Sequence, residues 1–214
     1  PGLVAEAFAQ MASGRPRPVL IEVPPDVLQA VGDVGAIEPG AAPSRPSGDP
    51  DLLEAAAKAL GEAKQPVIFV GGGILRAEAW EELRELAELL QAPVVMSASG
   101  KGALSARHYL AQNMVAGREL LPQADVILVA GTRFVQPATS TWGPRPDQTV
   151  IQMDIDPEEI GRNTPVAIGI EADLKAGLAE LVNRVPRHNR KRPSREEELT
   201  ALKERIDDLL FELQ

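Results

Sequence analysis

Short, largely apolar runs recur along the middle of the chain, and each is bounded by glycine, proline or polar residues. They occupy residues 66–70, 93–96, 125–130, 149–155 and 166–170. Consecutive apolar positions over so short a length are typical of strands that are buried on both faces. The runs therefore predict the strands of a parallel sheet, with the last run at an edge.

Between these runs, apolar residues recur at helical spacing. Helices are predicted from Asp49-Pro50 to about residue 60, over 76–90, over 120–124 and over 174–184, whereas 97–113 is expected to be irregular. The predicted buried faces are Leu53, Ala56, Ala57 and Leu60 in the first helix and Trp80, Leu83, Ala87 and Leu90 in the second. Strands that alternate with helices predict an α/β fold, a Rossmann-like doubly wound parallel sheet of five or six strands with helices on both faces.

The beginning of the chain has a different character. Residues 1–30 predict a helix over 3–11 and a strand over 18–23 that is stopped by Pro24 and Pro25. Two such elements cannot bury their own apolar faces, so we expect them to be the end of an N-terminal domain. Residues 31–50 are rich in Gly, Ala, Pro and Ser and predict a linker to a central domain over 51–186.

Residues 187–214 predict a basic, exposed linker followed by a last helix. Ser194 and Glu197 form a capping-box pattern at the start of that helix. Its apolar stripe consists of Leu199, Leu202, Ile206, Leu209 and Leu210. Because the sequence shows no partner for this stripe, we expect the helix to pack on another domain or subunit.

Composition narrows the class of protein. The chain has 214 residues, 44% of them hydrophobic, which suffices for one sizeable globular domain. A formal net charge of −9 argues against a nucleic-acid partner, and no apolar run approaches the ~20 residues that span a bilayer. The absence of cysteine excludes disulfides, thiolate metal sites and a cysteine nucleophile, and it fits a cytoplasmic protein. Because the chain opens at Pro1 without Met, we expect residues upstream of it.

The first candidate site is the glycine run that follows the strand predicted over 66–70. Gly71, Gly72 and Gly73 would let backbone N–H groups approach a phosphate at a helix start. The full G-x-G-x-x-G pattern is not met, because position 76 is Arg. A nucleotide site and a tight strand-to-helix turn therefore both remain open.

Two more loops follow predicted strands. Residues 97–104 contain Ser97, Ser99, Lys101 and Gly102, a set that fits a phosphate-binding loop or a simple connection, although it is not a P-loop. Gly131, Thr132 and Arg133 follow the strand over 125–130. Arg133 would grip a phosphate or stack on a flat ring, and the alternative is a surface arginine.

Acidic residues follow the strand over 149–155. Asp156 precedes Pro157 and lies three residues before Glu159, so it is expected to cap a helix start. That leaves Asp154 as the freer candidate to accept hydrogen bonds from ribose hydroxyls. We expect this pair of aspartates to bind no metal ion.

The chain has only two histidines. His188 lies in the basic segment over 187–192 and is expected to be solvated, and His108 is a secondary ligand candidate. No Ser-His-Asp order and no histidine pair with metal spacing is present, so no catalytic residue is assigned. The basic segment is expected to be a hinge rather than a nucleic-acid patch.

Taken in order, these segments resemble the middle domain of thiamine-diphosphate-dependent enzymes such as acetolactate synthase, glyoxylate carboligase and benzoylformate decarboxylase. Residues 14–27 look like the close of the family's N-terminal, pyrimidine-binding domain. The segments that resemble the middle domain are 66–73, 100–103, 124–134 and 150–163. The resemblance extends over roughly residues 14 to 184.

The resemblance implies a full-length parent that uses thiamine diphosphate and Mg²⁺ to act on 2-oxo acids, as a homodimer or homotetramer. It also implies a middle domain that holds FAD, an ADP-like nucleotide or nothing, with any ligand against residues 71–73, Lys101, 131–133 and 154–156. Two departures weaken the flavin reading. The glycine-rich stretch expected after His108 is shortened, and Ala172 precedes Asp173 where the family usually has Gly-Asp.

The resemblance further implies that the chemistry lies elsewhere. The glutamate that activates thiamine and the Gly-Asp-Gly…Asn motif that binds diphosphate and Mg²⁺ are absent from this chain. We therefore expect the chain to be catalytically incompetent alone and to need the missing N- and C-terminal domains as partners. The alternatives are a stand-alone FAD or nucleotide-binding module and a deacetylase-like NAD-binding domain, which would normally carry zinc cysteines.

Overall fold

A parallel sheet lies at the centre of the larger of two units into which the chain divides. The structure is a computed structural model that describes residues 2–33, 35, 45–135 and 144–212. Residues 1–45 and 46–214 form two separate compact units. The boundary lies within the linker predicted over 31–50, of which residues 34 and 36–44 lie outside the described residues.

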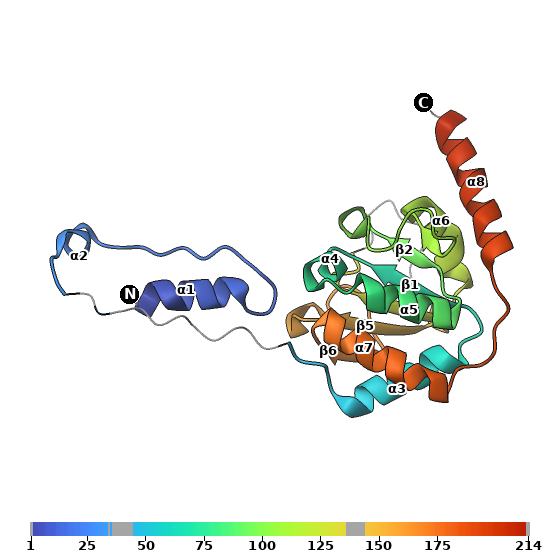
Figure 1. The fold of residues 1–214 in the computed structure, drawn as a ribbon, viewed down its shortest axis with the longest axis horizontal. Helices are drawn as coiled ribbons and strands as arrows, with labels where there is room; N and C mark the ends of the chain where they lie inside the picture. The colour runs from blue at the N-terminus through green and yellow to red at the C-terminus, as the bar shows by residue number, and fades with distance from the viewer. Residues whose placement is uncertain (1, 34, 36–44, 136–143, 213–214) are drawn as a thin grey trace. The chain divides into compact units, whose positions relative to one another are not determined.

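Six strands in the order β3-β2-β1-β4-β5-β6 form this sheet, and all neighbours are parallel (Figure 1). They are β1 Pro66–Val70, β2 Val94–Met96, β3 Ala111–Gln112, β4 Val126–Ala130, β5 Thr149–Asp154 and β6 Ile168–Glu171. All five apolar runs form strands, which confirms the predicted fold class. The sixth strand, β3, lies in the stretch that was expected to be irregular, because two residues are too few to show a period.

Helices cover both faces of the sheet, as predicted. Met153 of β5 faces α7 (Leu174–Arg184), since a Cβ atom at Gly177 would lie 2.6 Å from its sulfur atom. Gln152 directly precedes Met153 in β5, so its side chain points to the opposite face of the sheet. The strand register aligns Gln152, through β4 and β1, with Val95 of β2, and the Val95 side chain therefore lies on that same face. That face is covered by α6 (Met114–Leu120), whose Gly117 would place a Cβ atom 2.7 Å from Val95. The helices α3 (Pro50–Glu62) and α5 (Trp80–Leu90) pack against α7.

Side-chain caps set the starts of three of these helices. Asp49 accepts hydrogen bonds from two backbone N–H groups at the start of α3, and Asp173 does the same for α7. Asn113 caps α6, which begins earlier than the helix predicted over 120–124. The predicted stretch itself contains the end of α6 and the short 3₁₀ helix η2 (Leu121–Gln123), so a short helix is confirmed there but its start was placed too late.

The helix predicted over 76–90 is two helices, and its predicted face was wrong at one position. The first, α4 (Gly73–Ala77), ends at Glu78, whose φ of 56° is left-handed. The second, α5, starts afresh at Trp80. Its buried residues are Leu83, Leu86, Ala87 and Leu90. Trp80 is 44% exposed instead of buried, because it occupies the first position after the break.

The described part of residues 1–45 contains two helices and no strand. The first, α1 (Gly2–Ala12), agrees with the sequence, and α2 (Pro25–Gln29) follows the two prolines. The strand predicted over 18–23 is wrong, and Leu20 in its middle is 82% exposed. A strand needs a neighbour for its backbone N–H and C=O groups, and none of the described residues of this unit pairs with it.

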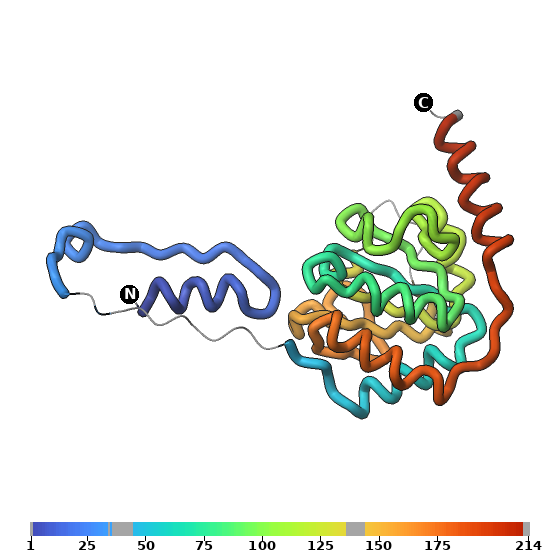
Figure 2. Tube along the Cα trace, viewed as in Figure 1, coloured from blue at the N-terminus to red at the C-terminus, as the bar shows by residue number. Residues whose placement is uncertain are grey.

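Residues 188–192 form a strap between α7 and α8 that binds the ends of two helices (Figure 2). The Nη2 atom of Arg192 lies 3.0, 2.9 and 2.7 Å from the carbonyl oxygens of Leu60, Gly61 and Ala63, at the end of α3. Asn189 Nδ2 donates to the last turn of α5 in the same way. Carbonyls at helix ends lack intrahelical partners, so a guanidinium satisfies them well. The prediction of an exposed linker therefore holds for Arg190 and Lys191 but not for Arg192, whose partial burial lowers its pKa.

The last helix, α8 (Glu196–Glu212), was expected to pack on another domain, yet its first half packs on its own unit. Leu199 and Ile206 are buried, and Lys203 Nζ donates to the carbonyls of Ala106 and His108 at 2.9 and 2.8 Å. This partner is a loop distant in sequence, which no local pattern reveals. The far end of the stripe stays exposed at Leu209, Leu210 and Phe211.

Ser194 lies just before α8, and its hydroxyl accepts a hydrogen bond from the backbone N–H of Glu196 at 3.2 Å, whereas the capping box with Glu197 stays a prediction. No helix among the described residues combines the length and the apolar character needed to cross a membrane.

Replacing Arg192 should loosen the strap. We expect Arg192→Met to lower the free energy of unfolding by about 1–3 kcal/mol, because three helix-end carbonyls lose their donor. Urea denaturation measures the change. The control is Lys191→Met, which removes an exposed cation from the same strap. Equal stability of the two variants would contradict the capping role.

Acid should weaken the contact between α3 and the strap. His188 Nε2 lies 2.7 Å from Glu54 Oε1, so His188 is not merely solvated as predicted. This hydrogen bond, with help from Arg184, lowers the pKa of Glu54 below its ordinary value of 4.5. Glu54 thus stabilises the fold above the pKa it has in the unfolded chain, and this contribution is lost as the pH falls through the lower, folded value.

We therefore expect Glu54→Gln to flatten the decline of stability below pH 4.5, as measured by urea midpoints across the acid range. Glu62→Gln changes an exposed carboxylate at the end of the same helix and is the matched control. A decline as steep in Glu54→Gln as in the parent chain would contradict this account.

Candidate functional site

Three of the predicted site segments lie at the carboxyl edge of the sheet. In the order β3-β2-β1-β4-β5-β6 the chain leaves β1 toward one side and β4 toward the other, so the switch point lies between β1 and β4. Ligands of open α/β sheets bind in the crevice at such a point. Residues 71–73 follow β1, residues 131–133 follow β4, and Asp154 ends β5.

Backbone hydrogen bonds join the glycine run directly to the end of β4. Gly71 N donates to Ala130 O at 3.1 Å, and Gly73 N donates to Gly131 O at 3.0 Å. Gly131 N in turn donates to Met153 O of β5 at 3.0 Å. The backbone ladder of the sheet therefore continues past the strand ends and takes up two of the three N–H groups in the glycine run.

The glycines are required by close backbone packing. A Cβ atom at Gly73 would lie 2.6 Å from Gly131 Cα, and one at Gly71 would lie 2.5 Å from Gly131 O and from Thr132 Cβ. Gly131 has a φ of +61°, and a Cβ atom there would lie 2.4 Å from a methyl of Leu174. We call this contact of residues 71–73 with 131–132 the β1–β4 junction. It matches the tight-turn alternative that the sequence left open.

The loop after β2 closes against the same junction. A Cβ atom at Gly100 would lie 2.6 Å from Val70 O, and one at Gly72 would lie 3.2 Å from Ser99 O. Ser97 caps the 3₁₀ turn η1 (Ala98–Gly100).

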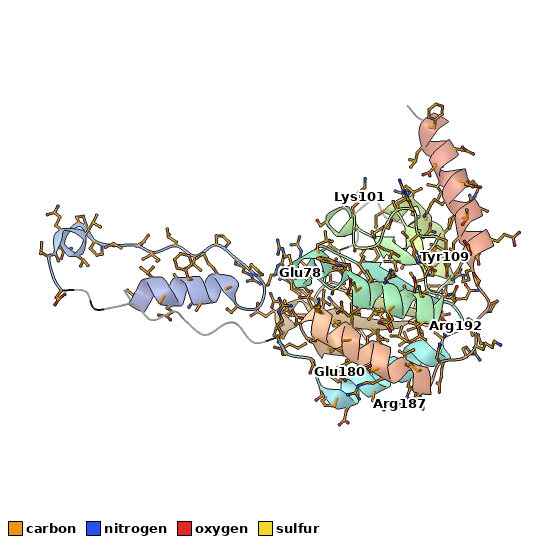
Figure 3. All side chains as sticks on the ribbon, in the orientation of Figure 1. Glu78, Lys101, Tyr109, Glu180, Arg187 and Arg192 are labelled. Atoms are coloured by element: carbon orange, nitrogen blue, oxygen red, sulfur yellow. The ribbon has the colours of Figure 1, made fainter. Side chains whose placement is uncertain are left out.

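The predicted phosphate ligands of this loop lie farther out. Lys101 is exposed at the tip of the loop and points away from the sheet (Figure 3), and a Cβ atom at Gly102 would meet open space. The fold thus brings the glycines together but leaves Lys101 outside their contact.

Gln152 fixes the loop that follows β4. Its Nε2 atom donates to the carbonyls of Thr132 and Glu159 at 3.2 and 3.1 Å, and its Oε1 atom accepts from Gly161 N at 2.9 Å. The side chain is only 2% exposed. Sequence reasoning missed this residue, although a glutamine inside an otherwise apolar strand is a usable signal, because a buried amide needs partners.

Arg133 is held by its backbone rather than by its side chain. Asn163 Nδ2 donates to Arg133 O at 2.7 Å, while the Arg133 residue is exposed. The next residue, Phe134, is buried and packs edge-on against Phe69 of β1 at 5.0 Å between ring centroids. Gln152 and Asn163, both in the segment over 150–163, therefore hold this loop by hydrogen bonds to its backbone carbonyls.

Asp154 and Asp156 each accept a hydrogen bond from a backbone N–H group two residues further along the chain. Asp154 is buried, and its Oδ1 atom accepts from Asp156 N at 3.0 Å. Asp156 Oδ1 accepts from Glu158 N at 3.2 Å, which confirms the predicted cap, although the capped element is only the 3₁₀ turn η3 (Pro157–Glu159). Buried Glu159 contacts Arg162 at 3.3 Å.

His108 lies away from the switch point. Its Nδ1 atom accepts from Leu110 N at 3.2 Å, and its Nε2 atom lies 3.0 Å from Glu88 Oε1. The hydroxyl of neighbouring Tyr109 donates to Gln91 Oε1 at 2.9 Å. Within residues 2–33, 45–135 and 144–212, no three His, Cys, Asp or Glu side chains are grouped to hold a metal ion.

A parallel sheet in this strand order, with a glycine turn at its switch point, defines the chain as an α/β domain of the dinucleotide-binding type of architecture. Comparison of the sequence with protein families identifies it more closely. Residues 53–181 match the model described as "Thiamine pyrophosphate enzyme, central domain". The chain belongs to this family.

Two named relatives support this family assignment. The chain is 38% identical over 197 residues to the acetolactate synthase of Mycobacterium leprae, a match that covers 85% of this chain and 31% of the relative. It is 37% identical over 192 residues to the acetolactate synthase large subunit of Corynebacterium glutamicum, again over 85% of this chain and 31% of the relative. The chain thus spans about a third of the length of these relatives.

A solved structure shows the same fold. It is described as a putative thiamin diphosphate-dependent enzyme from Mycobacterium smegmatis, and it superposes with a TM-score of 0.71 at 24% sequence identity. The match covers 86% of this chain and 37% of that chain.

The β1–β4 junction should make Gly131 far less replaceable than another glycine of similar conformation. Gly161 has a φ of +73°, and a Cβ atom there would meet only Val166 at 3.7 Å. Gly161→Ala should therefore cost about 1 kcal/mol of folding stability from its backbone angle alone. Gly131→Ala should cost a further 1–3 kcal/mol or so from overpacking.

Urea denaturation of both variants and the parent chain measures the difference. Because the two substitutions share the same backbone strain, their difference isolates the close approach of Gly131 to Gly73 and Leu174. Equal losses would contradict the tight contact.

Proposed function

We propose that this chain serves as the central domain of an acetolactate-synthase-like enzyme, which decarboxylates a 2-oxo acid and joins the remaining unit to a second substrate. The observation that carries the proposal is the family match over residues 53–181, together with relatives at 38% identity that are named acetolactate synthase. Thiamine diphosphate is the cofactor that the family name supplies.

The chemistry of thiamine would come from other parts of the parent enzyme. Thiamine diphosphate needs Mg²⁺ to hold its diphosphate, and Mg²⁺ takes carboxylate oxygens and water. The described residues contain no cluster of acidic or histidine side chains that fits such a site. We therefore propose that the N- and C-terminal domains hold thiamine diphosphate and Mg²⁺, and that this chain alone does not turn over substrate.

The role proposed for this domain is mechanical. Its strap and the buried half of α8 fix the path of the chain from α7 onward, through Arg192, Asn189 and Lys203. A chain path that is held rigidly after α7 suits a domain that bridges two others and supports a homodimer or homotetramer. We also propose a cytoplasmic location, which fits the absence of cysteine.

FAD or an ADP-like nucleotide was the other cofactor that the resemblance implied. The described residues do not fit its pyrophosphate at the glycine run, since Gly71 and Gly73 donate to β4. The comparisons name a thiamine enzyme rather than a flavin or NAD module, so the stand-alone module and the deacetylase-like domain are not favoured. No step of the proposed function depends on a nucleotide here.

The test is turnover of pyruvate with thiamine diphosphate and Mg²⁺, followed as acetolactate formation. The polypeptide translated from the complete reading frame should be active, and it should lose activity when thiamine diphosphate is omitted. The 214-residue chain should show no turnover under the same conditions. Turnover by the 214-residue chain, or an inactive complete polypeptide, would contradict the proposal.

A further inference from the structure

We infer that the β1–β4 junction is a packed joint, and that this domain binds no dinucleotide or ADP-type pyrophosphate at the switch point of its sheet. The inference concerns residues 71–73, 97–102 and 131–133, the segments that would have to hold such a ligand. It is independent of the proposed thiamine-dependent reaction.

The first support is the use of donors. An anion at a glycine turn is held by backbone N–H groups that point at it. Here Gly71 N and Gly73 N point at the carbonyl oxygens of Ala130 and Gly131, at 3.1 and 3.0 Å. A pyrophosphate could reach these donors only if the backbone ladder between β1 and β4 were broken.

The second support is the lack of clearance. In a nucleotide site, glycine leaves room for the ligand to approach the backbone. At Gly71 and Gly73 that room is filled by Gly131 and Thr132, as the distances of 2.5 and 2.6 Å from an added Cβ atom show. At Gly72 the neighbour is Ser99 O at 3.2 Å. At all three glycines, the space on the Cβ side is therefore filled by neighbouring residues of the chain and not left open.

The third support is the position of the polar side chains. Lys101 and Arg133 are exposed, and buried Asp154 accepts a hydrogen bond from Asp156 N. Gln152 meanwhile ties the 131–133 loop to the segment after β5 through two carbonyls. Moving the 131–133 loop to admit a ligand would break the hydrogen bond from Gln152 to the carbonyl of Thr132.

The experiment is titration of the complete 214-residue chain with FAD and, separately, with ADP, each at about 1 mM, by calorimetry and thermal unfolding. The variants Lys101→Met and Arg133→Met remove the two exposed cations, and Glu62→Gln serves as a surface control. We expect no saturable heat, no rise in the unfolding temperature with either ligand, and no change of these results in the variants.

Stoichiometric binding that Lys101→Met or Arg133→Met weakens about tenfold or more would overturn the inference, since it would place the ligand at these loops. Binding that both variants leave unchanged would overturn the inference if the ligand alters the hydrogen exchange of the Gly71 and Gly73 amides, and would agree with a closed junction if these amides exchange as in the free chain. Neither result bears on the proposed reaction, which is read from pyruvate turnover by the complete polypeptide.

Discussion

The contact between the turn after β1 and the end of β4 is the constraint on which the rest of the domain depends. Gly73 donates to Gly131, and Gly131 donates to Met153, so one line of hydrogen bonds crosses three strands beyond the sheet. The backbones approach so closely that no side chain fits between them. This approach requires glycine at positions 73 and 131. It also sets the start of α4 and the position of the loop after β4, which Gln152 holds by a hydrogen bond. A feature that looks like a ligand cradle in the sequence is thus a structural joint.

Much of the sheet could be predicted because its strands are apolar and short, and their partners follow from the order of elements. The same reasoning found the caps at Asp49 and Asp156, since a cap depends only on neighbours in the sequence. It failed where the partner lies far away. Arg192 binds helix ends about 130 residues earlier, and Lys203 binds carbonyls of the 106–108 loop, so neither contact leaves a local pattern. The binding role of the candidate site stays a prediction, because a glycine run looks the same whether it faces a phosphate or another backbone.

The family of this chain and the rigidity of its fold are consistent with each other. The family match identifies the chain as a thiamine pyrophosphate enzyme central domain, whose relatives are about three times its length. The structure shows backbone hydrogen bonds that join the turn after β1 to the end of β4, and a C-terminal strap bound to helix ends. Both features favour rigidity over ligand exchange. This rigidity suits the structural role that we propose for the domain.

Amide hydrogen exchange in the ligand-free chain is the most direct measurement of the β1–β4 junction, because it reports on the two donors themselves. The account predicts that the amides of Gly71 and Gly73 exchange more slowly than that of Gly102 in its exposed loop, on the order of a hundredfold or more. Exchange at Gly71 and Gly73 as fast as at Gly102 would show that the junction is open, and would contradict the claim that these glycines join β1 to β4.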